Sequence, residues 1–322
     1  MSSVQVRPFR RGDRDQLTQL VNAHAEAVVP GMSASVNTVL SSLERRPGEF
    51  IADPWVSDRV TLVAEQAGRV AAAAHLLRYF PDEQAGETAR DTGEICWLLF
   101  WPHAPAGNRY WPDAGGAAEA LMAGCAAQFG AWGVSRQYAG GELPVPGVYG
   151  VPEQWPHVAD LYQRSGFSHT GQTEVVYLAR VEDLPDPGGE PLGGIEPRRS
   201  VGINGVRLSA VLGPEVIGYI EIEILDAGER LSRHGGWADV GNLHVAAPYQ
   251  RQGVGTWLLG QAADWLRLAG VSRLLTYAWL EGTDPGGLNY DAYRAFLPAA
   301  GFHELTRTAR GWTRDQGVTA GA

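Results

Sequence analysis

Apolar and polar residues follow two different periods along this chain, and each period predicts one type of element. In 216–225 and 238–246 apolar residues recur at strand-like spacing, whereas in 253–269 they recur every three or four positions, as on one face of a helix. Strand-like and helical segments occur in mixed order along the whole chain. This order predicts an α+β fold in which mixed, largely antiparallel sheets are flanked by helices.

The predicted elements form two series. In the first, strands are expected at 4–8, 59–66, 69–79, 93–101, 134–139 and 173–180, and helices at 13–27, 33–46, 114–131 and 155–164. In the second, strands are expected at 205–211, 216–225, 238–246 and 273–280, and helices at 253–269 and 288–297. The second series has no counterpart of the two helices that open the first.

A segment without regular periodicity separates the two series. Residues 181–194 read VEDLPDPGGEPLGG and hold three prolines, four glycines and four acidic residues, which suit neither a helix nor a strand. We therefore expect an amino-terminal domain at 1–181, a linker at 182–194 and a carboxy-terminal domain at 195–322. A length of 322 residues also exceeds the usual size of one hydrophobic core.

The two series also repeat each other. AAQFGAWGVSRQYA at 126–139 and AADWLRLAGVSRLLTYA at 262–278 each pass from a helix, through glycine and Val-Ser-Arg, into a predicted strand. Further on, HVADLYQRSGF at 157–167 and YRAFLPAAGF at 293–302 each end a predicted helix at Gly-Phe. Two echoes in the same order indicate two copies of one structural unit.

Composition narrows the classes of partner. The net charge is −10 and all 26 basic residues are arginine, so we expect no nucleic-acid partner, because phosphate backbones require clustered cations. The two cysteines, Cys96 and Cys125, exclude a disulfide framework, and the eight histidines show no metal-ligand spacing, so no metal is expected. No segment reads as a secretion signal or as a bilayer-spanning helix, which predicts a cytoplasmic protein without a membrane partner.

The sequence YQRQGVGTWLLG at 249–260 connects a predicted strand to the helix at 253–269. The first amides of a helix have no partner within it, and glycines at 253 and 255 would leave these donors open to an anion. Each charge-assisted hydrogen bond contributes about 1.5 to 3 kcal/mol, so backbone donors could hold a diphosphate even on an acidic protein. The alternative is a tight turn before a core helix. A dinucleotide fingerprint would need glycine at Leu258, and a nucleotide P-loop would need lysine.

LHVAAPYQRQGVGTWLL at 243–259 resembles the acyl-CoA signature of the GNAT superfamily of N-acyltransferases, and NYDAYRAFLPAAGF at 289–302 resembles its second signature. The resemblance implies two tandem GNAT-like domains, of which the second binds acetyl-CoA as acyl donor. This architecture is similar to that of the mycothiol synthases, which acetylate the amine of a cysteinyl sugar. The cofactor-binding residues implied are Leu243, His244, Val245, Gln250, Arg251, Gln252, Gly253, Val254, Gly255, Thr256 and Asn289.

The equivalent loop of the first copy is degenerate. Aligned from the shared glycines Gly133 and Gly270, Gln250 corresponds to Asp113, and an aspartate there would repel a phosphate group. We expect the first copy to bind no coenzyme A, and instead to support the fold or shape the acceptor site.

Acyl transfer from a thioester to an amine requires a stabilised oxyanion and a base. The resemblance implies that the backbone N–H of Val245 contacts the acyl carbonyl and that a base lies eleven residues before Gln250, at Asp239. Glu223 on the preceding strand is a further candidate for the base, with Glu221 beside it. Each of these acids also fits the role of a solvated strand residue. His244, despite a suitable ordinary pKa, fits a structural role better.

The leaving thiolate also needs a proton. Members of the family commonly place a tyrosine four residues before the Gly of Gly-Phe, but that position holds Tyr162 in the first copy and Leu297 in the second. Tyr293, one turn earlier on the same helix face, is the candidate acid, and simple helix packing is the alternative. Asn289 would position pantetheine or substrate, or cap the helix.

These features predict an acetyl-CoA-dependent N-acetyltransferase that acts on the amine of a small molecule, as in resistance, tailoring or thiol biosynthesis. Because Leu297 replaces the usual tyrosine, a non-catalytic acyl-CoA-binding or scaffold protein is the alternative. The sequence does not identify the acceptor, and it is compatible with a homodimer.

Overall fold

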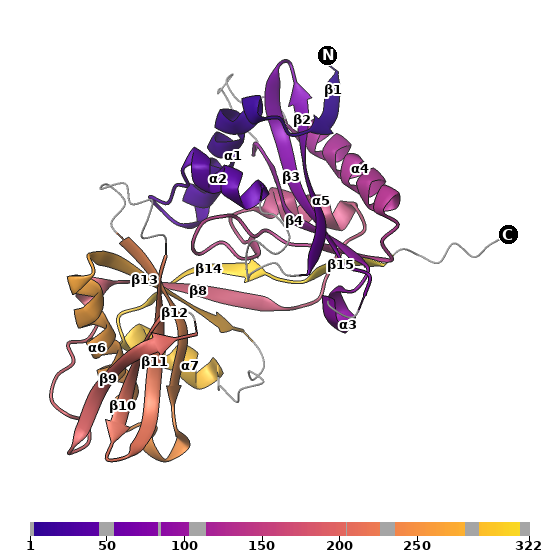
Figure 1. Ribbon diagram of the computed structural model, residues 1–322. Helices are drawn as coiled ribbons and strands as arrows, with labels where there is room; N and C mark the ends of the chain where they lie inside the picture. The colour runs from indigo at the N-terminus through magenta and orange to yellow at the C-terminus, as the bar shows by residue number, and fades with distance from the viewer. Residues whose placement is uncertain are drawn as a thin grey trace. The chain divides into compact units, whose positions relative to one another are not determined.

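The computed structural model describes residues 3–44, 55–82, 85–102, 114–203, 205–225, 236–280 and 290–315 (Figure 1). The chain forms two compact units. Unit 1 consists of residues 1–172 together with 308–322, and unit 2 consists of residues 173–307.

Unit 1 contains one mixed sheet with helices packed on it. Its elements are β1 (Val4–Pro8), η1 (Arg11–Asp13), α1 (Arg14–Val28), α2 (Val36–Leu43), β2 (Val56–Gln66), β3 (Arg69–Tyr79), α3 (Gly86–Ala89), β4 (Thr92–Phe100), α4 (Gly115–Trp132), β5 (Arg136–Ala139), β6 (Val151–Pro152), α5 (Pro156–Arg164), β7 (Ser168–His169) and β15 (Trp312–Asp315). The seven-stranded sheet has the order β1-β2-β3-β4-β5-β15-β7, and β4 and β5 pair in parallel. Residues 70–77 of β3 are all buried, because α1 and α4 both contact this strand.

Unit 2 repeats this arrangement without opening helices. Its elements are β8 (Thr173–Arg180), η3 (Val181–Asp183), β9 (Ile195–Gly202), β10 (Gly205–Leu212), β11 (Glu215–Leu225), β12 (Gly236–Val245), η4 (Ala247–Tyr249), α6 (Val254–Leu268), β13 (Val271–Trp279), α7 (Tyr290–Ala299) and β14 (His303–Ala309). The strands follow the order β9-β10-β11-β12-β13-β8-β14, and β12 and β13 pair in parallel. β9 and β10 form a direct hairpin where unit 1 inserts α1 and α2.

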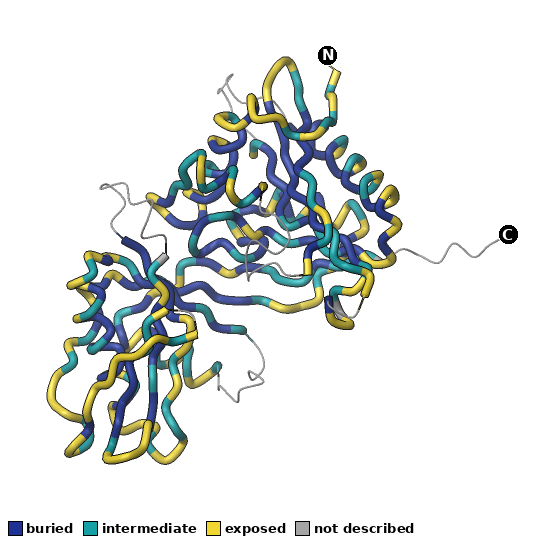
Figure 2. The backbone as a smooth tube through the Cα atoms, viewed as in Figure 1, coloured by how far each residue is buried: buried dark blue, intermediate teal, exposed yellow. Residues whose placement is uncertain are grey.

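The core of unit 2 lies between α6 and the sheet. Trp257, Leu258 and Leu266 on the buried face of α6 pack with Ile220 and Ile222 on β11. Burying each large apolar side chain contributes about 1.5 to 3 kcal/mol. The middle strands of the sheet are accordingly buried, whereas the edge strand β9 is exposed along most of its length (Figure 2). The helical period predicted for 253–269 is therefore confirmed.

The last strand of each copy pairs in the sheet of the other copy. The boundaries of the two units therefore differ from the predicted domain limits. Residues 174–180 of β8, predicted as the last strand of the first copy, pair with β13 of unit 2. Residues 312–315 of β15, at the far end of the chain, pair with β5 of unit 1. Each predicted domain, 1–181 and 195–322, therefore includes one strand that belongs to the sheet of the other unit. The prediction missed this because the pattern that marks a strand does not specify which strand it pairs with. The predicted linker at 182–194 lies within unit 2.

A buried histidine and a half-buried one lie side by side in unit 1. The Nε2 atoms of His24 and His157 lie 3.2 Å apart, and His24 Nδ1 lies 2.9 Å from the carbonyl oxygen of Leu20. Burial lowers the pKa of both imidazoles to about 4. Since these pKa values are lower in the folded than in the unfolded chain, the pair contributes stability above pH 6.5 that is lost as the pH falls towards 4.

We expect the free energy of unfolding of unit 1 to fall by about 2 kcal/mol between pH 6.5 and 5, because each pH unit costs about 1.4 kcal/mol for one titrating imidazole. Only His24 is counted, because His157 is partly exposed. Calorimetric melting of the wild type and of His24→Leu over this range tests the expectation. The variant should show the weaker pH dependence, and equal slopes in the two proteins would contradict it.

Candidate active site

Two neighbouring strands of unit 2 separate towards one end of the sheet. β12 and β13 pair only as far as Asp239 and Leu275, whereas β12 continues to Val245 and β13 to Trp279. At the same place the pairing of β12 with β11 shifts by one residue, which leaves Gly241 as a bulge. Within the described residues, the edge of β12 that faces β13 therefore has no strand partner beyond Asp239.

The backbone of β12 directs hydrogen-bond donors into this gap. Ala246 N–H donates to the carbonyl of Ile217 on β11 at 2.9 Å. Because successive residues of a strand point their N–H groups to opposite edges, the N–H groups of Leu243 and Val245 point away from β11 and into the gap. The carbonyl of Val245 points the same way, since it accepts a hydrogen bond from Gln250 Nε2 at 2.9 Å. An acyl carbonyl that entered the gap would meet the N–H groups of Leu243 and Val245.

The loop after β12 leaves the first amides of α6 open. Arg251 and Gly253 have left-handed φ angles of 59° and 84°, a conformation that glycine alone adopts without strain. The amide of Trp257 donates to the carbonyl of Gly253 at 2.9 Å, whereas no carbonyl of the described chain accepts a hydrogen bond from the amides of 253–256. These amides form a cradle of donors at the positive end of the helix dipole.

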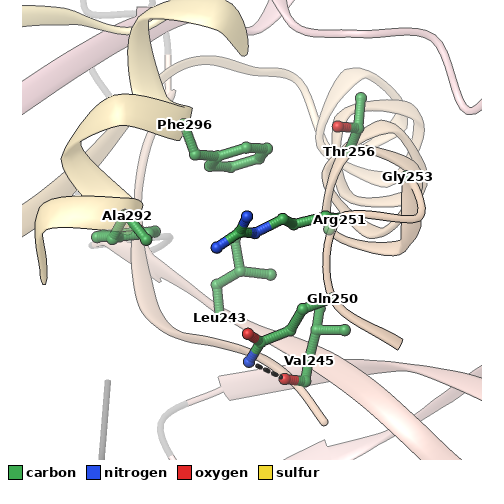
Figure 3. A pocket seen from close by; sticks show the side chains of 10 residues that line it. Leu243, Val245, Gln250, Arg251, Gly253, Thr256, Ala292 and Phe296 are labelled. Atoms are coloured by element: carbon green, nitrogen blue, oxygen red, sulfur yellow. Dashed lines mark hydrogen bonds between the residues drawn. The ribbon is translucent and has the colours of Figure 1, made fainter. Parts of the chain in front are cut away.

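A pocket of about 310 Å³ joins the gap to the cradle (Figure 3). In Figure 3 the guanidinium of Arg251 extends between Leu243 and Phe296, so it brings a positive charge into an otherwise largely apolar space. The residues that line the pocket are Leu243, Val245, Gln250, Arg251, Gly253, Gly255, Thr256, Ala292, Tyr293 and Phe296. Seven of these ten are among the cofactor-binding residues expected from the sequence.

Tyr293 reaches the pocket from α7. Its hydroxyl lies 2.6 Å from Thr276 Oγ1 on β13. Burial raises the pKa of Tyr293 to about 12, and the hydrogen bond with Thr276 partly offsets this effect. The phenol is therefore protonated at neutral pH and able to donate a hydrogen bond. Leu297, one turn further along α7, is only 1% exposed and belongs to the core.

Asp239 lies where the gap begins. Its neighbours Ala238 and Val240 belong to the core against α6, so the side chain of Asp239 points to the opposite face of the sheet. It is 7% exposed, and its Oδ2 accepts a hydrogen bond from the hydroxyl of Tyr277 at 3.1 Å. Glu223 is its direct partner on β11 and is exposed. The two candidate bases thus share the face opposite the pocket.

Glu221 shares this face but is engaged in a structural ion pair. Its Oε1 lies 2.6 Å from Arg207 Nη2 and accepts a hydrogen bond from the amide of Ile203 at 3.2 Å. The residue is 2% exposed. A carboxylate held in this way is a poor candidate for the base, in contrast to Asp239 and Glu223.

The structure places the side chains of three other predicted residues outside the pocket. His244 is exposed on the opposite face of the sheet, where its ring lies 5.7 Å from that of Tyr219. Val254 is 1% exposed in the core, and the side chain of Gln252 donates to a loop carbonyl at 2.7 Å. Asn289 lies outside the described residues.

Sequence reasoning missed four residues at or next to the site, namely Thr276, Tyr277, Ala292 and Phe296. Ala292 and Phe296 are four residues apart and flank Tyr293 on one helix face, so the helical period could have found them. Nothing in the sequence places Thr276 beside Tyr293 or Tyr277 beside Asp239.

The geometry agrees with a comparison against protein families. Residues 181–285 match the model of the acetyltransferase (GNAT) family, and this range includes both the gap and the cradle. Over this range the chain matches a GNAT domain. The second unit is therefore similar to a family of acetyltransferases over this range.

Solved structures extend the similarity to both units. A tandem GNAT protein from the clavulanic acid biosynthesis pathway is 17% identical with a TM-score of 0.65, and the alignment covers 98% of this chain and 100% of that one. A GCN5-related N-acetyltransferase from Sphaerobacter thermophilus is 15% identical with a TM-score of 0.58, covering 97% and 95%. A glucosamine N-acetyltransferase region of a fungal multi-domain β-N-acetylglucosaminidase is 13% identical with a TM-score of 0.61, covering 97% and 38%. A search of curated proteins gave no significant match.

These similarities establish a tandem GNAT fold. In the first unit, backbone hydrogen bonds fill the place that corresponds to the gap beside β12. The pairing of β4 with β5 ends at Ile95, but Gly140 N–H then donates to the carbonyl of Ile95 at 2.8 Å, and Glu142 N–H to that of Cys96 at 3.0 Å. Tyr162, at the usual tyrosine position of GNAT enzymes, is fully buried and donates to the carbonyl of Gly140 at 2.9 Å. Burial raises its pKa well above the ordinary value. Asp113 lies outside the described residues.

Two further observations concern only the described part of the chain. Among these residues, no three His, Cys, Asp or Glu side chains lie close enough to share a metal ion. None of the helices within the same ranges has the length and apolar character needed to cross a membrane.

Proposed function

We propose that the protein is an acetyl-CoA-dependent N-acetyltransferase whose second unit transfers an acetyl group to the amine of a small molecule. The observation that carries this proposal is the continuous pocket between the open amides of α6 and the gap beside β12. The amides of 253–256 and Arg251 would hold the diphosphate, and Leu243, Val245 and Phe296 would line the pantetheine.

The chemistry follows from the groups around the gap. Val245 N–H would stabilise the oxyanion that forms when the amine attacks the thioester carbonyl. Asp239, at the start of the gap on the opposite face, would accept a proton from the amine directly or through a water molecule. Tyr293 would donate a hydrogen bond to the leaving thiolate. No metal ion is required for these steps.

A non-catalytic acyl-CoA-binding protein is the second candidate, and one observation favours it. The usual tyrosine position of the active copy holds Leu297, which is buried in the core and cannot serve as an acid. In this case the pocket would bind acyl-CoA, but no acceptor would be acetylated.

Titration calorimetry with acetyl-CoA, combined with an assay of thiol release, separates the two candidates. The assay should include polyamines, aminoglycosides, amino sugars and cysteinyl sugars as acceptors. Binding with turnover of at least one amine supports the enzyme. Tight binding without turnover across the panel supports the second candidate, and the absence of binding refutes both.

We expect Asp239→Asn to lower kcat/KM by about 100-fold at pH 7, the lower bound of the usual contribution of general-base catalysis. The deficit should shrink as the pH rises, because a growing share of the amine is then already neutral. Glu223→Gln is the matched control, since Glu223 is the exposed cross-strand partner of Asp239. A larger loss in the control, or a pH profile unchanged by Asp239→Asn, would assign the base elsewhere.

A further inference from the structure

The segment that composition predicts as a linker is packed onto the GNAT domain. Residues 181–194, here named the strap, run from the 3-10 helix η3 to the start of β9. Val181 and Leu184 are buried, and Leu192 packs against the same core. The strap therefore has anchors near both of its ends.

The strap packs against α6 at its middle and last turns, and it passes close to Gly253, which precedes the first turn. At the middle, a Cβ atom on Gly260 would lie 2.6 Å from the Cα of Pro187, so the strap backbone rests directly on the helix. At the last turn, Arg267 donates to the carbonyl of Val181 at 3.3 Å. Just before the first turn, a Cβ on Gly253 would lie 3.4 Å from the side chain of Pro191. The strap therefore passes beside the cradle, of which Gly253 is part.

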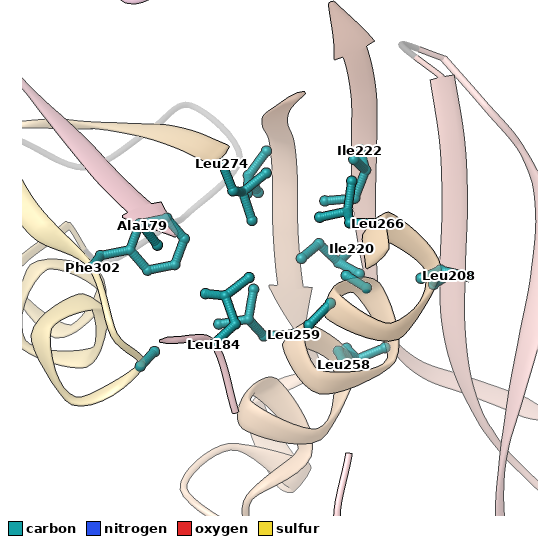
Figure 4. Packing of buried hydrophobic residues seen from close by; sticks show 14 of the residues in the cluster. Ala179, Leu184, Leu208, Ile220, Ile222, Leu258, Leu259, Leu266, Leu274 and Phe302 are labelled. Atoms are coloured by element: carbon teal, nitrogen blue, oxygen red, sulfur yellow. The ribbon is translucent and has the colours of Figure 1, made fainter. Parts of the chain in front are cut away.

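The strap also holds the turn that follows α7. A Cβ on Gly301 would lie 2.6 Å from the carbonyl oxygen of Asp183, and Gly301 has a left-handed φ of 91°. Leu184 lies between Phe302, beyond α7, and Leu259 on α6 (Figure 4). The strap thus joins α6, which carries the cradle, to the end of α7, which carries the opposite wall of the pocket.

We infer that the strap is a positioning element for the acyl-CoA pocket, an inference that rests on the proposed function. It fixes the left-handed turn at Gly253 and the separation between α6 and α7. A pocket that is held ready for its ligand binds more tightly, because less ordering remains to occur on binding. When only a fraction of the molecules has the competent pocket, the apparent Kd rises by the inverse of that fraction. Cofactor affinity therefore depends on a segment outside the pocket lining.

Gly260→Ala tests the inference, because its methyl group would displace the strap at Pro187. Alanine forms helices better than glycine, so any loss of affinity cannot come from a weaker α6. We expect the Kd for acetyl-CoA and its KM to rise about tenfold, which corresponds to a pocket competent in one molecule in ten. The kcat at saturating acetyl-CoA and the KM of the acceptor should not change.

Leu268→Ala is the matched control, since Leu268 lies on the same helix, is 90% exposed and should leave the Kd unchanged. The double variant Pro187→Gly, Pro191→Gly makes the strap more flexible without adding a side chain. It provides the test of the inference if Gly260→Ala does not fold. It should raise the Kd in the same direction, and hydrogen exchange at the amide of Trp257, which donates to the carbonyl of Gly253, should accelerate in both strap variants.

The outcomes separate the strap from the proposed function. A folded Gly260→Ala protein with wild-type Kd and wild-type exchange would overturn the strap's role while the function stands. A fall in kcat with unchanged KM would also overturn it. If the wild type binds no acetyl-CoA, the proposed function fails, and unaltered exchange at the amide of Trp257 in the strap variants would then refute the inference separately.

Discussion

Replacing Gly253 by glutamate is expected to abolish binding of acetyl-CoA, with a rise in Kd of at least about 1,000-fold. Loss of three charge-assisted hydrogen bonds, at about 1.5 kcal/mol or more each, accounts for this factor. The new carboxylate would also repel the diphosphate. In addition, the φ of 84° at this position strains any residue other than glycine. Titration calorimetry of the purified variant gives the Kd directly.

Gly116→Glu provides a matched control in the first copy, where Gly116 corresponds to Gly253. Gly116 is exposed at the start of α4, and a Cβ there would meet no atom within 4 Å, so the substitution should fold normally. We expect it to leave the Kd unchanged. If Gly116→Glu were the variant that lost the cofactor, the site would lie in unit 1 and the enzyme assignment would have to be withdrawn.

Trp312→Ala is expected to lower the free energy of unfolding of unit 1 by about 3 to 5 kcal/mol, the usual range for removing a large buried aromatic side chain. Trp312 is 2% exposed, and its ring lies 5.8 Å from that of Tyr162 and 5.2 Å from that of His169. Differential scanning calorimetry should show the transition of unit 1 at lower temperature. Unit 2 should still bind acetyl-CoA, since Trp312 belongs to unit 1.

Two truncations sharpen the same prediction. Ending the chain after Gly311 removes all of β15, including Arg314, whose Nη1 donates to the carbonyl of Ser165 at 2.9 Å. This truncation should unfold unit 1. Ending the chain after Asp315 keeps β15 and should have little effect. A first unit that survives the shorter chain with unaltered melting would show that the exchanged strand is dispensable.

Most of the regular elements could be predicted from the sequence, because their periodicity reflects burial on one face. The strand at 4–8 and the strand at 69–79 have the predicted bounds, and α6 differs from its prediction by one residue at each end. The strand β9 at 195–202 was not predicted. Its sequence IEPRRSVG is exposed at six consecutive positions, so it carries no alternation to reveal it, and its proline is tolerated at a sheet edge.

The exchange of strands could not be predicted for a different reason. Residues 173–180 show a clear strand pattern, and they do form β8, but a pattern of buried positions does not name the neighbouring strand. The pairing of β8 with β13 joins segments about 100 residues apart. Sequence proximity had suggested the first copy as the partner, and the structure corrects this.

The candidate site was predicted where its geometry is local and missed where it is not. The cradle at 253–256 depends on a short loop and on the start of one helix, so glycine spacing was sufficient to locate it. The side-chain directions of His244 and Val254 depend on a bulge and on helix packing, which spacing does not report. Thr276 and Tyr277 reach the site only through the pairing of separate elements.

The exchange of β8 and β15 has a consequence for synthesis on the ribosome. Amino-terminal domains usually fold first, as soon as they have left the exit tunnel. Here the sheet of unit 1 stays incomplete until residues 312–315 emerge, which is only after all of unit 2 has been synthesised. Until then, β5 of the nascent amino-terminal half has an edge without its strand partner. The two halves therefore complete their folding together rather than one after the other.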